Sequence, residues 1–442
     1  MLVSQTVQPR ILRCRTLQPH GTKYVVKGQV LTVPSVPPGR FSLSQPVDSE
    51  GAKQKVVYLD NAETTRLDPL VLDLVEGFMM DKYGVPAGEF GYKLEEEAGE
   101  AIEQARETIA RKINATPEEV IFTSGGTESS NIAILGAARS SYYKGKRLIT
   151  SKIEHTSILR IVDKLTTQGF EKTLLDVDRQ GFVDPSSLKT NLQNTRLVSI
   201  QQANQEIGTL QDVTAIGEIA RNSGILFHCD AVQSLGKERI DVQKMKVDLL
   251  SMSSHLIHGP KGVGALYVRD GVKLEPILEG DGREKGLRPG TPNVAGIAGF
   301  AKAAELLTDE DALRMRGLRD ELINSLLAIP DSRLNGPKGD RRLCNNVNVS
   351  FRFVEGEAIL MHLDLKGLVV NTGSACYSQK LEPSHVIRAI GGTLEESHSS
   401  TRLSMSKWTT RDDIAYATET VKQVVETLRA HSPLARKAYQ RK

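Results

Sequence analysis

The sequence predicts an α/β protein, with a mostly parallel sheet in a large domain and a smaller α+β domain after it. Three observations support this fold class. Short apolar runs alternate with helical patterns from Val56 onward, a long helical pattern and then a strand follow residue 310, and the chain has 442 residues. Strands that alternate with helices are typical of parallel sheets, and a chain of this length can bury one large core and a second one.

We expect three parts: an N-terminal extension over residues 1–54, a large domain over 55–310 and a small domain over 311–442. The first 47 residues contain no Asp or Glu. They carry the basic residues Arg10, Arg13, Arg15, Lys23, Lys27 and Arg40. This composition is compatible with an organelle transit peptide, although it lacks a clear amphipathic helix; an accessory extension is the interpretation that we favour.

A helix is predicted over residues 94–113, where apolar side chains recur every three to four positions. This stripe comprises Leu94, Ala98, Ile102, Ala105, Ile109 and Ile113. Thr116 followed by Pro117 indicates the start of another helical turn, because proline is favoured at the first helical position. The next apolar run, VIFTS at residues 120–124, suits a buried strand.

The same alternation continues through the middle of the chain. It comprises RLIT, TSILRIVDKL, LLDV, RLVSIQQ, VTAIGEIARNSG, ILFHCD and VDLLSMS. Parallel strands of this kind are covered by helices on both faces, and ligands gather at their carboxyl ends. Past residue 310, EDALRMRGLRDELINSLLAI and CNNVNVSF indicate a smaller domain that closes over that edge.

Charge and cysteine usage limit the class of partner. The net charge of +3 with mixed signs favours neither nucleic acid nor an anionic membrane, and no apolar run is long enough to span a bilayer. The four cysteines, Cys14, Cys229, Cys344 and Cys376, are scattered and have no metal-site spacing. We therefore expect a reducing, cytoplasmic compartment and a small-molecule or protein partner.

Polar groups stand at several predicted strand ends. GGTES places Gly126 and Thr127 where a strand passes into a helix, and free helical N–H groups there can bind a phosphate. Asp230 ends ILFHCD, His155 ends another strand, and Asn204 lies in QQANQEIG. Taken singly, each has an ordinary structural alternative: a turn, a cap or a buried histidine. Their shared edge favours one functional site.

The small domain adds a thiol and a guanidinium. Cys376 lies among small residues in NTGSACYSQKLEP, on an expected exposed loop, as a reactive cysteine requires. Arg402 in SSTRLSMSK can bind a carboxylate through two hydrogen bonds. The alternatives are a small buried side chain for Cys376 and a structural ion pair for Arg402.

In this order, these stretches closely resemble the cysteine desulfurases, pyridoxal-phosphate enzymes that make a protein persulfide from L-cysteine for iron–sulfur cluster assembly. The most specific parts are YLDNAETT, IFTSGGTES, ANQEIG, FHCDAVQSLGK, GPKGVGALYV, LRPGT and GSACYSQKLEPSHVIRAIG, within a match from about Val56 to Pro433. The resemblance implies the aspartate-aminotransferase-like fold (fold type I), a homodimer, and delivery of sulfur to a cluster scaffold protein.

The resemblance also assigns roles. The cofactor phosphate is expected at Gly126, Thr127, Ser253, His255 and, from the second subunit, Thr291. The cofactor ring is expected to contact Asp230 at its nitrogen, Gln233 at its hydroxyl, His155 by stacking, and Asn204 at its side. Arg402 would bind the substrate carboxylate, and Cys376 would attack the substrate sulfur. Cys376 is also a candidate ligand of a transient iron–sulfur cluster.

Several positions depart from the family pattern. Leu256 follows the loop histidine, where the family has the Schiff-base lysine. Glu63 stands where alanine is usual, and Val85 and Phe90 stand where asparagine and histidine are usual. After the predicted strand that contains Arg402, this chain has Ser406-Lys407 where the family usually has Gly-Arg. Lys261 also occurs in active relatives, so we do not expect it to replace the missing amine.

Without the lysine, turnover should fall by several orders of magnitude, because a positioned acid–base group contributes about 10² to 10⁴ in rate. Noncovalent cofactor binding remains compatible with the sequence. One hypothesis is a desulfurase with slow chemistry. The other, which we favour slightly, is a non-catalytic homodimer that uses Cys376 and external sulfide with a cluster scaffold. An aminotransferase would also need the amine and is disfavoured.

Overall fold

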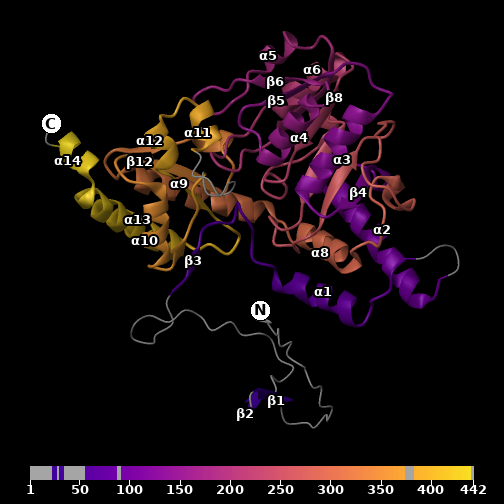
Figure 1. Cartoon of the computed structure of the whole chain (residues 1–442), viewed down its shortest axis with the longest axis horizontal. Coiled ribbons are helices and arrows are strands. Elements are labelled where there is room, and N and C mark those ends of the chain that lie inside the picture. Colours follow the sequence, from indigo (N-terminus) through magenta and orange to yellow (C-terminus); the bar gives the residue numbers. More distant parts are fainter. Residues whose placement is uncertain (1–21, 27–28, 34–54, 87–90, 374–382, 440–442) are drawn as a thin grey trace, which may run out of the picture. The chain divides into compact units, whose positions relative to one another are not determined.

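The computed structural model describes residues 22–26, 29–33, 55–86, 91–373 and 383–439 (Figure 1). The chain forms two compact units, Met1–Lys55 and Val56–Lys442. In the first unit, β1 (Thr22–Val26) pairs with β2 (Gln29–Val33) in antiparallel fashion. None of the helices in the described ranges combines the length and hydrophobicity that a bilayer span requires.

A seven-stranded sheet forms the centre of the second unit. Its order is β4 (Val120–Thr123), β10 (Gly264–Val268), β9 (Leu249–Ser253), β8 (Leu226–Asp230), β7 (Thr195–Gln201), β5 (Arg147–Ser151) and β6 (Glu171–Leu175). Strand β10 is antiparallel to both of its neighbours, and every other pairing in the sheet is parallel. The predicted mostly parallel sheet is therefore confirmed.

Helices cover both faces of this sheet (Figure 1). They are α1 (Pro69–Met80), α2 (Lys93–Ile113), α3 (Gly126–Arg139), α4 (Thr156–Thr166), α5 (Pro185–Lys189), α6 (Val213–Asn222), α7 (Val242–Met245) and α8 (Val294–Glu305). The predicted stripe of α2 is buried from Ala98 to Ile113, whereas Leu94 is half-buried. Thr116 and Pro117 begin only a short 3-10 turn, Pro117–Glu119.

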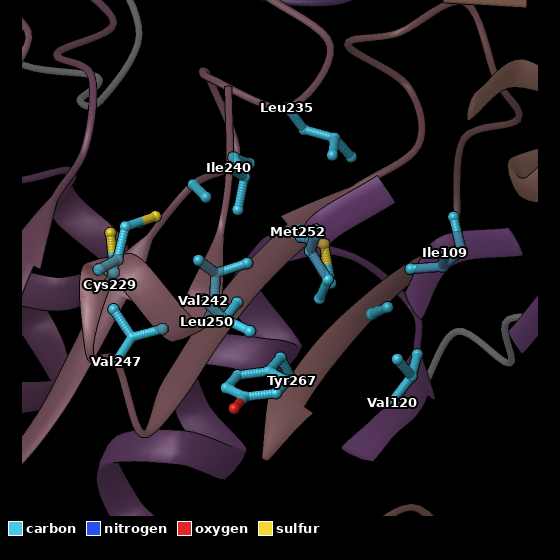
Figure 2. Close-up of a cluster of buried hydrophobic side chains, with 14 of the residues drawn as sticks. Ile109, Val120, Cys229, Leu235, Ile240, Val242, Val247, Leu250, Met252 and Tyr267 are labelled. Atoms are coloured by element: carbon cyan, nitrogen blue, oxygen red, sulfur yellow. The ribbon is translucent and has the colours of Figure 1, made fainter. Parts of the chain in front are cut away.

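One apolar cluster packs on each face of the sheet. Leu250 and Met252 of β9 point into one cluster with α2, while Leu249 points into the other with α3 and α4. Figure 2 shows the first cluster around Leu250, Met252 and Tyr267. Successive side chains of a strand point to opposite faces, so alternate residues of one apolar run serve both cores.

The remaining elements form a second, α+β body. Its elements are β3 (Val57–Tyr58), α9 (Asp309–Leu327), β11 (Ser332–Leu334), β12 (Asn346–Phe351), α10 (Gly356–Asp364), β13 (Leu368–Val369), α11 (His385–Ala389), α12 (Leu394–His398), β14 (Ser400–Ser404), α13 (Arg411–His431) and α14 (Pro433–Tyr439). Strands β11, β12 and β14 form an antiparallel sheet, and β3 pairs in parallel with β13. Val57 and Leu59 thus join the core of this C-terminal body, so the chain enters it before it builds the large sheet.

Candidate active site

A cavity of about 170 Å³ lies at the carboxyl ends of the parallel strands. It brings together eight residues that the sequence singled out. These are Gly126, Thr127, His155, Asp230, Gln233, Ser253, His255 and Arg402. Leu256 and Glu63, two of the departures, line the same cavity. The strand ends predicted to share an edge therefore do face one space.

One end of the cavity is suited to a phosphate ester. Helix α3 begins there, and Gly125 before it has φ +150°, a conformation that favours glycine. A Cβ on Gly126 would lie 2.4 Å from a methyl carbon of Val232, so a side chain does not fit. Ser253 presents a buried hydroxyl that has no hydrogen-bond partner within the described residues. Helix N–H groups and this hydroxyl are donors that an anion would satisfy.

The lining of the cavity includes a buried carboxylate that accepts one hydrogen bond from the described residues. Asp230, 8% exposed, accepts a hydrogen bond from the Val232 N–H at 2.9 Å and forms no ion pair with the described residues. Burial raises the pKa of Asp230 to about 6. Gln233 donates from Nε2 to the Ala62 carbonyl at 2.9 Å, while its buried Oε1 has no partner in the described part of the chain. A cationic ring N–H and a hydroxyl would satisfy these two groups.

His155 is a neutral side chain that lines the cavity. It is the N-cap of α4, and its Nδ1 accepts a hydrogen bond from the Ser157 N–H at 3.2 Å. Because Nδ1 is the acceptor, the proton lies on Nε2. Burial lowers the pKa of His155 to about 4, so the ring stays uncharged at neutral pH. His155 thus has both a structural role, as a cap, and a surface toward the cavity.

No lysine is among the described residues that line the cavity. Leu256 is 2% exposed and supplies an aliphatic side chain in its place. Lys261 is exposed and does not line the cavity. Lys237, 8% exposed, donates from Nζ to the Gln233 carbonyl at 3.1 Å and does not line the cavity. Its pKa is lowered by burial to about 8.

Arg402 on β14 reaches the cavity from the C-terminal body. Its Nη2 lies 2.8 Å from Asp60 Oδ1 and 3.4 Å from Glu63 Oε2. Its Nη1 is 3.5 Å from the Gln205 carbonyl. The arginine therefore lines the site and, at the same time, forms the ion pair that was the structural alternative.

Two predicted cofactor contacts lie outside this lining. Asn204 is fully buried: its Nδ2 donates to the Ile153 carbonyl at 2.8 Å, and its Oδ1 accepts the N–H groups of Glu206 and Ile207. It holds the loop after β7, behind the cavity wall. Thr291 is exposed, and its neighbour Asn293 lines a separate cavity of about 250 Å³. A contact of Thr291 with a second subunit stays a prediction.

The predicted nucleophile Cys376 and Phe90 lie outside the described residues, as does Cys14. Cys229 and Cys344 are buried, and burial raises the pKa of the Cys344 thiol to about 11. Neither has the access that a reactive cysteine needs. The described residues contain no group of three or more His, Cys, Asp or Glu side chains that could hold a metal ion.

Three acidic residues near the site were not singled out from the sequence. Asp60 binds Arg402, which lies 342 positions later in the chain. Glu154 and Glu206 are buried, and burial raises their pKa values to about 8 and about 7. Glu154 directly precedes His155 in the turn between β5 and α4, a signal that could have identified it. The position of Asp60 depends on the pairing of β3 with the C-terminal body and leaves no local signal.

Comparisons with known proteins agree with this arrangement. Residues 57–416 match the aminotransferase class-V family. The chain is 47% identical over 387 residues to cysteine desulfurase IscS of Dictyoglomus turgidum, covering 86% of this chain and 97% of the relative. It is 45% identical over 396 residues to cysteine desulfurase IscS of Methanosarcina thermophila, covering 89% of this chain and 97% of the relative.

Solved structures give the same result. A NifS-like protein superposes with a TM-score of 0.79 at 34% identity, over 85% of this chain and all of that chain. A NifS-like protein from Rickettsia africae superposes with a TM-score of 0.76 at 30% identity, over 84% of this chain and all of that chain. By sequence identity and by fold, the chain belongs to the aminotransferase class-V family and, within it, to the IscS group of cysteine desulfurases.

Proposed function

We propose that this chain is an iron–sulfur cluster assembly protein that binds pyridoxal phosphate noncovalently and has slow or silent cysteine desulfurase chemistry. The observation that carries the proposal is that Leu256 lines a cavity whose other residues are suited to bind the cofactor. The names of the IscS relatives supply the reaction class.

The donor set of the cavity fits pyridoxal phosphate. Gly126, Thr127 and Ser253 would hold its phosphate, Asp230 its protonated ring nitrogen, and Gln233 its ring hydroxyl. These contacts complete groups that the chain leaves with one partner or none among the described residues. When bound, the cofactor supplies an aldehyde that condenses with the substrate amine and a ring that acidifies the α-carbon.

The residues of this chain supply the binding groups of the site but not its proton-transfer group. Neutral His155 offers a flat surface to the cofactor ring, and Arg402 offers a guanidinium to a carboxylate. Cys376 would accept sulfur as a persulfide. Leu256 has no titratable group, so no proton moves at the position where the family has an amine. Binding groups are thus retained, while the proton-transfer group is missing.

Restoring the amine tests this proposal. We expect Leu256→Lys to raise sulfide release from L-cysteine, with pyridoxal phosphate and a thiol reductant present, by at least about 100-fold over wild type. Leu256→Met is the matched control, because it changes the side chain without adding an amine. Wild-type release as fast as that of Leu256→Lys would contradict the proposal.

A second experiment tests whether the cofactor is bound covalently or noncovalently. After borohydride treatment and denaturing gel filtration, we expect the cofactor chromophore to stay with Leu256→Lys and to separate from wild type. A chromophore retained by wild type would mean that another amine, such as Lys237, holds the aldehyde covalently.

A second candidate function is a non-catalytic homodimer that assists a cluster scaffold with external sulfide. The combination of Leu256 with Glu63 beside Arg402 favours it, because both alter the substrate end of the cavity. Cluster assembly on a scaffold with added sulfide should then be faster with wild type than with Cys376→Ala. Equal rates for the two proteins would count against this function.

A further inference from the structure

Arg402 meets two carboxylates of its own chain, and they differ in freedom. Asp60 is fixed: its Oδ1 accepts from Arg402 at 2.8 Å and its Oδ2 accepts from Asn371 Nδ2 at 3.0 Å. Glu63 has a side chain that is 52% exposed, and its Oε2 lies 3.4 Å from Arg402 Nη2. Asp60 is therefore a buried partner of the arginine with a second hydrogen bond, whereas Glu63 is a partner whose side chain is half-exposed at the cavity.

The backbone keeps Glu63 at this place. The Glu63 N–H donates to the Asp60 carbonyl at 3.1 Å, which closes a tight turn. The turn is tied to β14, since the Ala62 N–H donates to Ser404 Oγ at 2.7 Å. Arg402 lies on that same strand. The backbone of Glu63 and the strand that carries the guanidinium are thus held together by short contacts.

The carboxylates that contact Arg402 outnumber its single guanidinium. Arg402 contributes one positive charge, and Asp60 and Glu63 contribute two negative charges. The charge of Glu63 also acts on His155 and His255. Burial lowers the pKa of each histidine, so they add no positive charge at neutral pH. The carboxylate of an α-amino acid would arrive as a third anion beside a guanidinium that is already paired, an unfavourable arrangement.

We propose that Glu63 is a specificity-determining residue that occupies the carboxylate-binding face of Arg402, so the cavity prefers primary amines that lack an α-carboxylate, such as thioalkylamines, over α-amino acids. The ammonium group of such a ligand complements Glu63, and the ligand brings no anion to Arg402. This inference rests on the proposed role of Arg402 as the carboxylate subsite and names the substrate class that Glu63 imposes on it.

Two ligands that differ only in the carboxylate test the inference. S-methyl-L-cysteine and 2-(methylthio)ethylamine both have a blocked sulfur, so neither can cyclise onto an aldehyde. Isothermal titration calorimetry on the full chain gives the ratio of their dissociation constants, both as purified and after saturation with pyridoxal phosphate. Wild type should bind the amine more tightly. Glu63→Ala and Glu63→Gln should shift the ratio toward the amino acid by about tenfold.

Glu279→Gln, an exposed charge that does not line the cavity, is the control and should leave the ratio unchanged. A ratio in Glu63→Ala equal to that of wild type, or no binding of either ligand to any variant, would overturn the inference. Failure of the proposed function appears separately, as no retention of pyridoxal phosphate by any sample, while the effect of Glu63 is still measured on the protein as purified.

Discussion

Asp230, at the end of β8, and Glu154, in the turn after β5, are two buried carboxyl groups with different hydrogen-bond partners. Glu154 accepts from Ser151 Oγ at 2.5 Å and from the Gln201 N–H at 2.9 Å, and burial followed by the nearby Asp230 charge raises its pKa to about 8. At pH 7 Glu154 is therefore neutral, and it spares Asp230 a like-charge neighbour. Asp230, with a pKa of about 6, is the group that carries the negative charge.

We expect the affinity for pyridoxal phosphate to fall about tenfold as the pH drops from about 7.5 to about 5, because Asp230 gains a proton and loses its attraction for a cationic ring N–H. Equilibrium titration by absorbance measures it. Asp230→Asn should bind weakly throughout and keep only the pH dependence of the cofactor's own phosphate. Superimposable pH profiles for the two proteins would contradict the role of Asp230.

At the scale of elements, the loop after β7 contacts the residues on both sides of the segment that carries Cys376. Ser384, just before α11, donates to Glu206 Oε1 at 2.5 Å. Gly373, on the other side of that segment, lies so close that a Cβ built on it would be 1.9 Å from the same oxygen. Asn204 fixes the backbone N–H of Glu206. One buried carboxyl group thus contacts the two described ends that flank residues 374–382.

Gly373→Ala should lower the free energy of unfolding by about 1–3 kcal/mol, because Glu206 is buried and bonded to Ser384 and cannot move aside without loss. Urea denaturation measures the change. Gly317→Ala in α9 is the control: a Cβ there meets nothing within 4 Å, and the substitution should be neutral or stabilising by up to about 1 kcal/mol. Equal midpoints for the two variants would show that position 373 tolerates a side chain.

Local patterns predicted most of these elements, because an apolar stripe or run reports directly on burial. The stripe of α2 and the strand runs that end at Asp230 and Ser253 are examples. Because the carboxyl ends of parallel strands share one edge, the sequence also predicted that His155 and Asp230 lie at one site. The sequence did not predict which strands pair with each other. The antiparallel insertion of β10 and the return of Val57 to the C-terminal core depend on contacts far apart in sequence, and so does the pairing of Glu63 with Arg402.

At the scale of the whole molecule, helix α1 exposes several large apolar side chains. Large side chains are exposed along it and just beyond it: Leu70, Leu72, Met79, Met80 and Tyr83. Exposed large apolar side chains are frequent at protein interfaces. Together with Thr291, which lies outside the lining of its own chain's cavity, these side chains support the proposed homodimer.

Light scattering after size-exclusion chromatography should give a dimer mass for wild type. Met80→Glu, which places a charge on a side chain that is 70% exposed, should shift the mass toward a monomer at micromolar concentration. Met361→Glu on α10 is a matched control, since Met361 is 68% exposed and lies in the other body. A Met80→Glu protein that stays dimeric would place the subunit contact elsewhere.

The aliphatic wall at Leu256 also has a metabolic consequence. An imine to a lysine slows the release of the cofactor, whereas a cofactor held only through its phosphate and ring dissociates more readily. With the pocket filled as proposed, the melting temperature follows the concentration of free pyridoxal phosphate by mass action. The fraction of this chain that escapes unfolding would then depend on the supply of that cofactor.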